Sequence, residues 1–245
     1  IEMVFHEGDS LAVRERAWKV VDLFCEAVGK EKLVYWHDGM PARLISSAAQ
    51  KKLTTKKQKS LDNPKGYAMM FHLASGSPKP PEAWTDNAQN FRLRCCIANE
   101  EFTWLHDRHT SPGIGPSMSF IRMAFPAWWI INQPPESNVG RITSQVVELM
   151  QPFWAIAGWG VMSTVEERNI GPISQGQQVL YPYLQRFPGL NALGSLALIS
   201  HDFNNAMYSI NWLSFVSDAL LEKLGGREAV RKQVEASQYL SAGDV

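Results

Sequence analysis

The feature that most restricts the fold is a stretch of eight residues in which apolar and polar side chains alternate. Phe91, Leu93, Cys95 and Ile97 are separated by Arg92, Arg94, Cys96 and Ala98. Successive side chains of a β-strand point to opposite faces of a sheet, so a period of two predicts a strand with one buried face. This is the clearest strand of the chain, and the fold is therefore expected to contain a β-sheet.

Residues 10–28 have the period of a helix instead. Their apolar side chains, from Leu11 to Val28, recur at steps of three and four, with charged side chains opposite. Asp9 or Ser10 can cap the first amides, and Gly29 can take the left-handed conformation that ends a helix. The spacing predicts an amphipathic helix between these caps.

The remaining elements follow from the same two periods and from the positions of Gly and Pro. Further strands are expected at residues 1–7, 33–37, 67–74, 118–125, 153–162 (or a buried apolar segment there), 208–215 and 238–241. Further helices are expected from about 135 to 151, within 175–187, near 217–224 and at 227–235. Lys51 to Lys65 carries six lysines without a usable apolar period, which predicts a flexible, solvated loop at about residues 51–65.

Strands and helices alternate, but without the regular spacing of a doubly wound parallel sheet. Several strands also follow one another without a helix between them. The sequence therefore predicts an α+β fold, in which an antiparallel or mixed β-sheet is packed with helices. At this length, residues 1–245 are expected to form a single domain.

Charge and cysteine content exclude several classes of protein. The chain has 24 Lys and Arg against 24 Asp and Glu, which argues against direct nucleic-acid binding. No run of about 18 apolar residues is present, so no contact with a membrane is expected. The odd number of cysteines, three, favours free thiols and a cytoplasmic protein. Ile1 in place of Met leaves open whether a signal peptide has been removed.

One cluster has the residue types of a metal site. His106, Asp107 and His109 lie in a loop-like stretch, and imidazole and carboxylate groups are common zinc ligands. However, no second group of ligands accompanies them, and neither a Gly-x-Ser-x-Gly turn nor a phosphate loop occurs elsewhere. A polar loop without a metal is the favoured interpretation, and no catalytic residue, metal or cofactor is expected.

The chain contains nine tryptophans, which bear on both the core and a possible protein interface. Most are expected in the core, but Trp84, Trp104 and one of Trp128 and Trp129 are predicted near loops. An exposed aromatic side chain there would suit the anchor of a protein interface.

The last third of the chain resembles a known family. The resemblance rests on residues 187–191 (FPGLN), 209–216 (SINWLSFV), 220–226 (LLEKLGG) and 240–244 (LSAGD), with 116–126 (PSMSFIRMAFP) upstream. This ordered set is similar to the TsiV-like immunity proteins of type VI secretion systems, in which residues 240–244 match a closing strand and turn. The matched residues belong to the scaffold, since Trp212 suits a core and Gly225 suits a helix end.

The resemblance implies a non-enzymatic antitoxin that binds and neutralises one type VI effector, with some relatives paired with Tox-REase nucleases. An inhibitor of a nuclease is expected to present carboxylates to its basic groove. Five acidic residues at predicted loop ends are the predicted toxin-binding residues: Glu100, Glu101, Asp107, Glu166 and Glu167. The free chain is expected to be a monomer or weak dimer.

Two other functions stay open at this point. One is a metal-dependent enzyme that uses the loop of His106, Asp107 and His109. The other is a structural subunit of an oligomer, with the tryptophan-rich loops as its interface.

Overall fold

A computed structural model of the chain gives the fold. It describes residues 1–5, 10–37, 43–44, 46–63, 69–75, 90–97, 119–132, 139–162, 186, 191–193 and 213–242. Among these residues, no helix is both long and apolar enough to cross a membrane.

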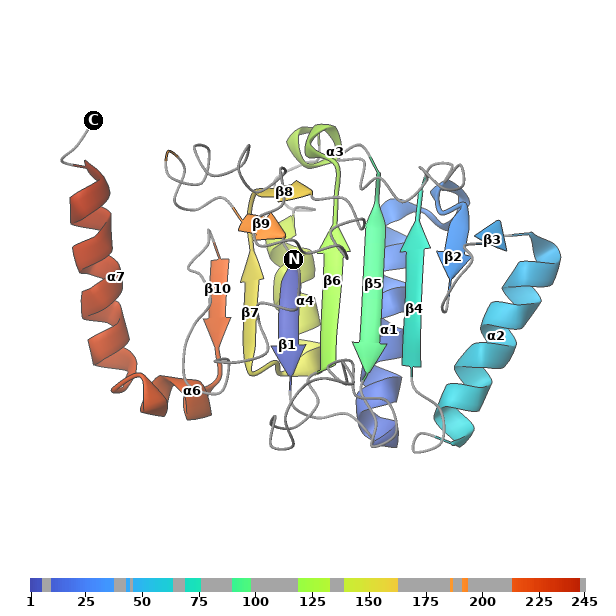
Figure 1. Ribbon diagram of the computed structural model, residues 1–245, viewed down its shortest axis with the longest axis horizontal. Helices are drawn as coiled ribbons and strands as arrows, with labels where there is room; N and C mark the ends of the chain where they lie inside the picture. Colours follow the sequence, from blue (N-terminus) through green and yellow to red (C-terminus); the bar gives the residue numbers. More distant parts are fainter. Residues whose placement is uncertain are drawn as a thin grey trace, which may run out of the picture.

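Within the described ranges, ten strands form two sheets (Figure 1). The strands are β1 (Glu2–Phe5), β2 (Tyr35–His37), β3 (Arg43–Leu44), β4 (Met69–Ala74), β5 (Arg92–Ile97), β6 (Ser119–Ala124), β7 (Trp154–Ala157), β8 (Gly160–Met162), β9 (Asn191–Leu193) and β10 (Leu213–Val216). The large sheet has the order β10-β7-β1-β6-β5-β4-β2-β3, and β8 and β9 form a small second sheet. All pairs of the large sheet are antiparallel, whereas β8 and β9 are parallel.

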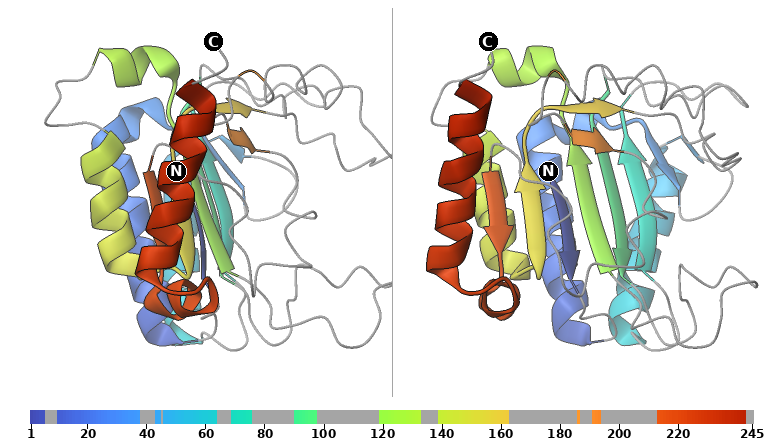
Figure 2. Two further views of the ribbon diagram at one scale, coloured as in Figure 1. Left: turned by 90° about the vertical axis from the view of Figure 1, so that its left-hand side faces the viewer. Right: turned by 60° about the vertical axis from the view of Figure 1, so that its left-hand side comes forward.

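The helices lie mainly on one face of the large sheet and beside its two edges. They are α1 (Leu11–Val28), α2 (Ser47–Asp62), α3 (Ala127–Ile131), α4 (Val139–Met150), α6 (Asp218–Lys223) and α7 (Arg227–Ala242), with a 3-10 turn η1 (Lys30–Lys32) after α1. Figure 2 shows α1 and α4 side by side on one face, and Figure 1 shows α2 and α7 at opposite ends of the strand order. The predicted α+β class, with an antiparallel sheet packed with helices, is confirmed.

Helix α1 begins and ends where the capping residues predict. The Ser10 hydroxyl accepts a hydrogen bond from the Val13 amide at 3.2 Å. At the other end Gly29 has φ of 89°, a conformation that glycine adopts readily because it lacks a Cβ atom. Its amide donates to the Cys25 carbonyl at 3.0 Å and closes the last turn.

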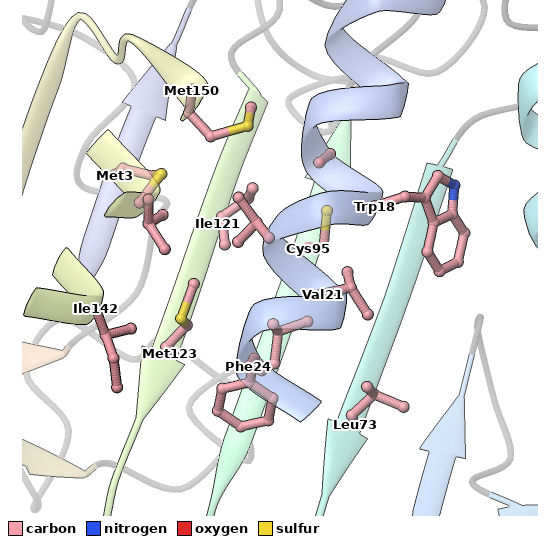
Figure 3. Close-up of a cluster of buried hydrophobic side chains, with 14 of the residues drawn as sticks. Met3, Trp18, Val21, Phe24, Leu73, Cys95, Ile121, Met123, Ile142 and Met150 are labelled. Carbon is pink, nitrogen blue, oxygen red and sulfur yellow. The ribbon is translucent and has the colours of Figure 1, made fainter. Parts of the chain in front are cut away.

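The core lies between α1, α4 and the strands beneath them (Figure 3). From α1 it contains Val21 and Phe24, and from α4 it contains Ile142 and Val146. The facing strand side chains are Met3, Leu73, Leu93, Cys95, Ile97, Ile121 and Met123. The alternation in residues 91–98 therefore does place Leu93, Cys95 and Ile97 on the core face, as predicted.

The opposite face of the sheet is more covered than the alternation predicts. Cys96 and Phe120 point away from α1, yet their side chains are only 1% and 5% exposed. Trp154 and Ile156 of β7 form a second, smaller cluster with Leu220 of α6. The prediction of a single buried face was therefore wrong at Cys96, which is buried although it shares its face of β5 with the partly exposed Arg92 and Arg94.

The prediction of a loop at residues 51–65 is also wrong for most of this range, because α2 spans Ser47–Asp62. The Trp18 indole N–H donates to the Ser60 hydroxyl at 2.9 Å in a buried contact between α2 and α1. Lys56 is buried, and the ammonium of Lys57 lies 5.4 Å from the Trp18 ring and 3.2 Å from Asp22. These contacts to α1 stabilise a helix whose own sequence has little apolar periodicity.

The end of the chain differs from its prediction as well. A single helix, α7, occupies Arg227–Ala242, where a short helix at 227–235 and a strand at 238–241 were expected. The strand that the family resemblance placed at Leu240 is therefore absent from these described residues. The segment contains neither Gly nor Pro before Gly243, and Arg231 pairs with Glu228 and Glu235 along the helix. Continuous helix propensity and these pairs favour one helix.

Other predicted elements are mostly present. Residues 153–162 form β7 and then β8, while β10 begins at Leu213, within the strand predicted at 208–215. Ser217 caps α6 as predicted, through its hydroxyl and the Leu220 amide at 3.2 Å. The helix predicted within 175–187 lies outside the described residues except for Arg186.

The three cysteines are free thiols, as predicted. Burial is the largest cause that raises the pKa of Cys25, to about 11, with the Asp22 carboxylate as the next cause. Burial also raises the pKa values of Cys95 and Cys96 well above the usual range. At neutral pH all three are therefore protonated and poor nucleophiles.

The contact between Trp18 and Ser60 gives a first testable prediction. In Ser60→Ala the buried indole loses this acceptor, so the free energy of unfolding should fall by about 1–3 kcal/mol. Urea unfolding measures the change. Thr55→Ala, on the exposed side of α2, is the matched control and should stay within about 0.5 kcal/mol of the wild type. Equal stability of the two variants would contradict the docking of α2 through Trp18.

The thiols give a second prediction. Because the fold raises the pKa of Cys25 from 9.0 to about 11, its thiolate fraction at pH 8 should be about 100-fold lower than in the unfolded chain. Native protein should therefore react slowly with iodoacetamide at Cys25, and Cys95 and Cys96 should react only after unfolding. The unfolded chain releases these protons at lower pH, so the free energy of unfolding should fall as the pH rises from 9 to 11.

Peptide mass spectrometry at pH 8, with and without urea, identifies the modified thiols. Modification of Cys95 in native protein at the rate of Cys25, or stability that rises between pH 9 and 11, would contradict the buried positions.

Candidate partner-binding surface

The predicted toxin-binding carboxylates lie outside the part of the chain that the structure describes. This holds for all five of them: Glu100, Glu101, Asp107, Glu166 and Glu167. His106 and His109 of the possible metal loop lie outside it too. Within the described ranges, no group of three or more His, Cys, Asp and Glu side chains is placed to hold a metal ion.

A cluster of aromatic rings lies where β6 ends. Phe125 stacks on Trp129, with ring centroids 5.0 Å apart and planes 17° apart. Phe91, just before β5, contacts Phe125, Trp128 and Trp129 edge to face, at 6.5, 5.8 and 5.8 Å. Phe24 of α1 contacts Phe125 at 5.5 Å. These contacts join the short helix α3 to the core.

Helix α3 begins directly after Pro126, whose missing amide donor suits a helix start. Trp129 points inward and is 5% exposed, whereas Trp128 is 44% and Ile131 is 72% exposed. Residues three apart lie on the same side of a helix, so the two exposed side chains share the outer side of α3. One of these two tryptophans was expected near a loop and most tryptophans in the core; Trp129 is in the core, whereas Trp128 is partly exposed.

A third exposed apolar side chain comes from the same edge of the sheet. Strands β6 and β7 both pair antiparallel with β1, so their final residues lie at one edge, where Figure 1 shows α3 and β8. Trp159 follows β7 there and is 51% exposed. Trp159 is one of the tryptophans that were expected in the core. Its flanking glycines, Gly158 and Gly160, were the available signal of a turn.

Positive charge lies beside the aromatic cluster. The Lys32 ammonium lies 5.8 Å from the centroid of the Phe91 ring, which also contacts Trp128. Lys30, Glu31 and Lys32 of η1 are all exposed. The Lys32 ammonium therefore lies near the ring on which Trp128 of α3 packs.

The second face of the sheet carries further positive charge. Arg94 of β5 lies directly opposite Arg122 of β6, and Arg92 shares their face. Burial, and then Arg94 and Arg122, lower the pKa of Arg92 to about 10. The Arg94 guanidinium also lies 5.4 Å from the Phe120 ring centroid. Such a group of partly buried guanidinium side chains is suited to hold carboxylates or other anions.

The burial of the other tryptophans fits their prediction where it is described. Trp18 and Trp154 are 3% and 1% exposed and belong to the core. Trp84 and Trp104, the other two interface candidates, lie outside the described residues.

Comparison with known proteins gives a match to a family model and a similarity to a solved structure. The family model for TsiV, described as type VI immunity for VRR-NUC, matches residues 97–242, more than half of the chain. No curated protein matches the chain.

Among solved structures, the Pseudomonas aeruginosa T6SS protein PA0821 has a similar fold, with a TM-score of 0.63 and 14% sequence identity. The match covers 95% of this chain and 58% of that chain, so the present chain spans little more than half of its length. At this identity the likeness concerns the fold alone. The family match over residues 97–242 places the chain in the TsiV family of type VI immunity proteins.

Proposed function

We propose that this immunity protein neutralises a nuclease effector of a type VI secretion system by binding it and covering its active site or a neighbouring surface. Membership of the TsiV family is the observation that carries this proposal. The family description names VRR-NUC as the target, which makes a nuclease of that class the preferred effector over the Tox-REase kind.

Such an inhibitor works by occupying a surface and needs no chemistry of its own. It requires shape and charge complementarity to one partner, and apolar anchors at the centre of the contact. The exposed Trp128, Ile131 and Trp159 supply apolar surface of this kind. We therefore propose a non-enzymatic protein, acting in the cytoplasm of the cell that carries the effector.

The charge distribution favours contact through the predicted carboxylates. Of the 24 acidic residues, thirteen lie in the segments between or beyond the described ranges, against four of the 24 basic residues. The described ranges therefore have an excess of basic residues, and the sequence segments that contain the five predicted carboxylates have an excess of acidic ones. A nuclease binds phosphates through Lys and Arg, so acidic segments complement its substrate groove.

The proposal predicts a kinetic effect of charge. With the effector encoded beside this chain as the ligand, the wild type should bind at about nanomolar Kd or tighter. Replacing Glu100, Glu101, Asp107, Glu166 and Glu167 together by Lys should slow association by about tenfold or more at low salt, because steering between opposite charges is lost. Surface plasmon resonance at two salt concentrations measures this.

The control carries five Glu→Lys or Asp→Lys changes on described, exposed positions of the helices: Glu15, Glu26, Glu148, Asp218 and Glu222. It has the same net charge as the test variant. Equal association rates for the two variants would remove the five predicted residues from the interface. Absence of binding by the wild type would contradict the proposed function itself.

A further inference from the structure

We propose that Arg92, Arg94 and Arg122 form a binding site for a phosphate group on one face of the large sheet. This face is turned away from α1 and α4, which cover the other face (Figure 2). The three guanidinium groups are called the arginine site. The inference goes beyond the proposed function and does not depend on it, because the ligand is a small anion and not the effector.

Strand pairing places the three arginines side by side. Arg94 of β5 and Arg122 of β6 are direct partners in the antiparallel register, so their Cβ atoms lie about 5 Å apart on one face. Arg92 precedes Arg94 by two residues and therefore lies on the same face, about 7 Å away along the strand. The alternate residues Leu93 and Ile121 belong to the core on the other face. The sheet itself thus brings three guanidinium groups within reach of one anion.

Small side chains flank one end of the arginine site, and a buried ring supports the other. The register partners of Arg92 are Ala74 on β4 and Ala124 on β6, whose side chains are single methyl groups. The Arg94 guanidinium lies 5.4 Å from the ring centroid of Phe120, which is 5% exposed. A guanidinium that packs on a buried ring is oriented before the anion arrives, so less conformational entropy is lost on binding.

Positive charge is in excess at this position of the sheet. Burial, and then the charges of Arg94 and Arg122, lower the pKa of Arg92 to about 10, which shows that the three groups lie close enough to repel one another. The register places Glu2 of β1 beside Arg122, and His72 of β4 beside Arg94. One carboxylate set against three guanidinium groups leaves a net positive charge, which a bound anion would balance.

The number of donors favours a phosphate group over a single carboxylate. Each guanidinium carries five N–H donors, so the three arginines can keep their other contacts in the chain and still donate to an anion. A phosphate group on an organic molecule offers three acceptor oxygens and nearly two negative charges, whereas a carboxylate offers two oxygens and one charge. Three planar forks around one position therefore match a phosphate. Free phosphate and the phosphate of a nucleotide share this chemistry.

Thermal unfolding of the chain in increasing inorganic phosphate tests the site, with sodium chloride used to hold the ionic strength constant. A ligand that binds the folded state raises the Tm, and the rise in the wild type should be half-maximal at about 1 mM phosphate or below. Arg94→Gln should need at least about tenfold more phosphate for the same rise, because one charged fork is lost.

Two further variants separate a built site from general attraction of anions. Arg227→Gln removes the same side chain from an exposed position at the start of α7, and its response to phosphate should equal that of the wild type. Arg94→Lys keeps the charge but loses the planar fork, so it should still bind phosphate several-fold more weakly. If Arg94→Gln does not fold, Arg94→Lys decides the test.

Adenosine monophosphate is the second probe, and it distinguishes the two sources of phosphate. A half-maximal rise at a lower concentration than with inorganic phosphate would identify a nucleotide, and one at an equal or higher concentration would identify free phosphate; both results support the site. A rise in Tm that does not saturate, or equal responses of the Arg94 variants and Arg227→Gln, would overturn it, because phosphate would then act as a salt on the whole surface. No effector is present in these measurements, so their failure leaves the proposed function standing.

Discussion

The pairing of β1 with both β6 and β7 is the constraint on which the rest of the structure depends. Glu2–Phe5 lies inside the large sheet, with β6 on one side and β7 on the other. The first residues of the chain therefore hold together two parts of the sheet that are more than a hundred residues away in sequence. Met3 and Phe5 also place side chains in the core beneath α1 and α4. Without β1, the strands β7 and β10 would not be hydrogen-bonded to the other five strands of the large sheet.

The position of β1 in the sheet also shows which part of the fold the family match leaves out. The matched residues 97–242 include β6, β7 and β10, but β1 precedes the match and lies between β6 and β7 in the sheet. The matched region is therefore not a complete structural unit of this fold. The similarity to PA0821 over 95% of the chain is consistent with a scaffold that includes the first 96 residues.

The packing of aromatic rings beneath α3 bears directly on the proposed binding. Strands β5 and β6 and helix α1 supply Phe91, Phe125 and Phe24, the rings on which α3 rests. A core of this kind can present Trp128 and Ile131 to a partner without rearrangement. The chain has no net charge, but its described ranges have an excess of basic residues and its other sequence segments an excess of acidic ones, so one molecule can offer both signs to a partner.

How much the sequence predicts depends on whether the signal is local. Helix α1 has a clear helical period and capping residues, and β5 has a clear alternation, so their positions follow from their own residues. Helix α2 does not, because its stability depends on Trp18 and Asp22 of another helix. Residues 227–242 contain signals for more than one structure, and the chain's continuous helix propensity prevailed. At the candidate site, the position of one of Trp128 and Trp129 near a loop was predicted, but the exposure of Trp128 and Ile131 depends on how α3 packs on Phe91 and Phe125. Trp159 was missed because a tryptophan is usually buried, and the five carboxylates stay a prediction.

The most direct test of the central claim is co-expression of this chain with the effector encoded beside it, in a host that the effector alone kills. The account predicts that growth is restored, and that equimolar purified chain abolishes the nuclease activity of the effector in solution. Continued toxicity with both proteins present at comparable levels, together with undiminished nuclease activity in solution, would contradict it.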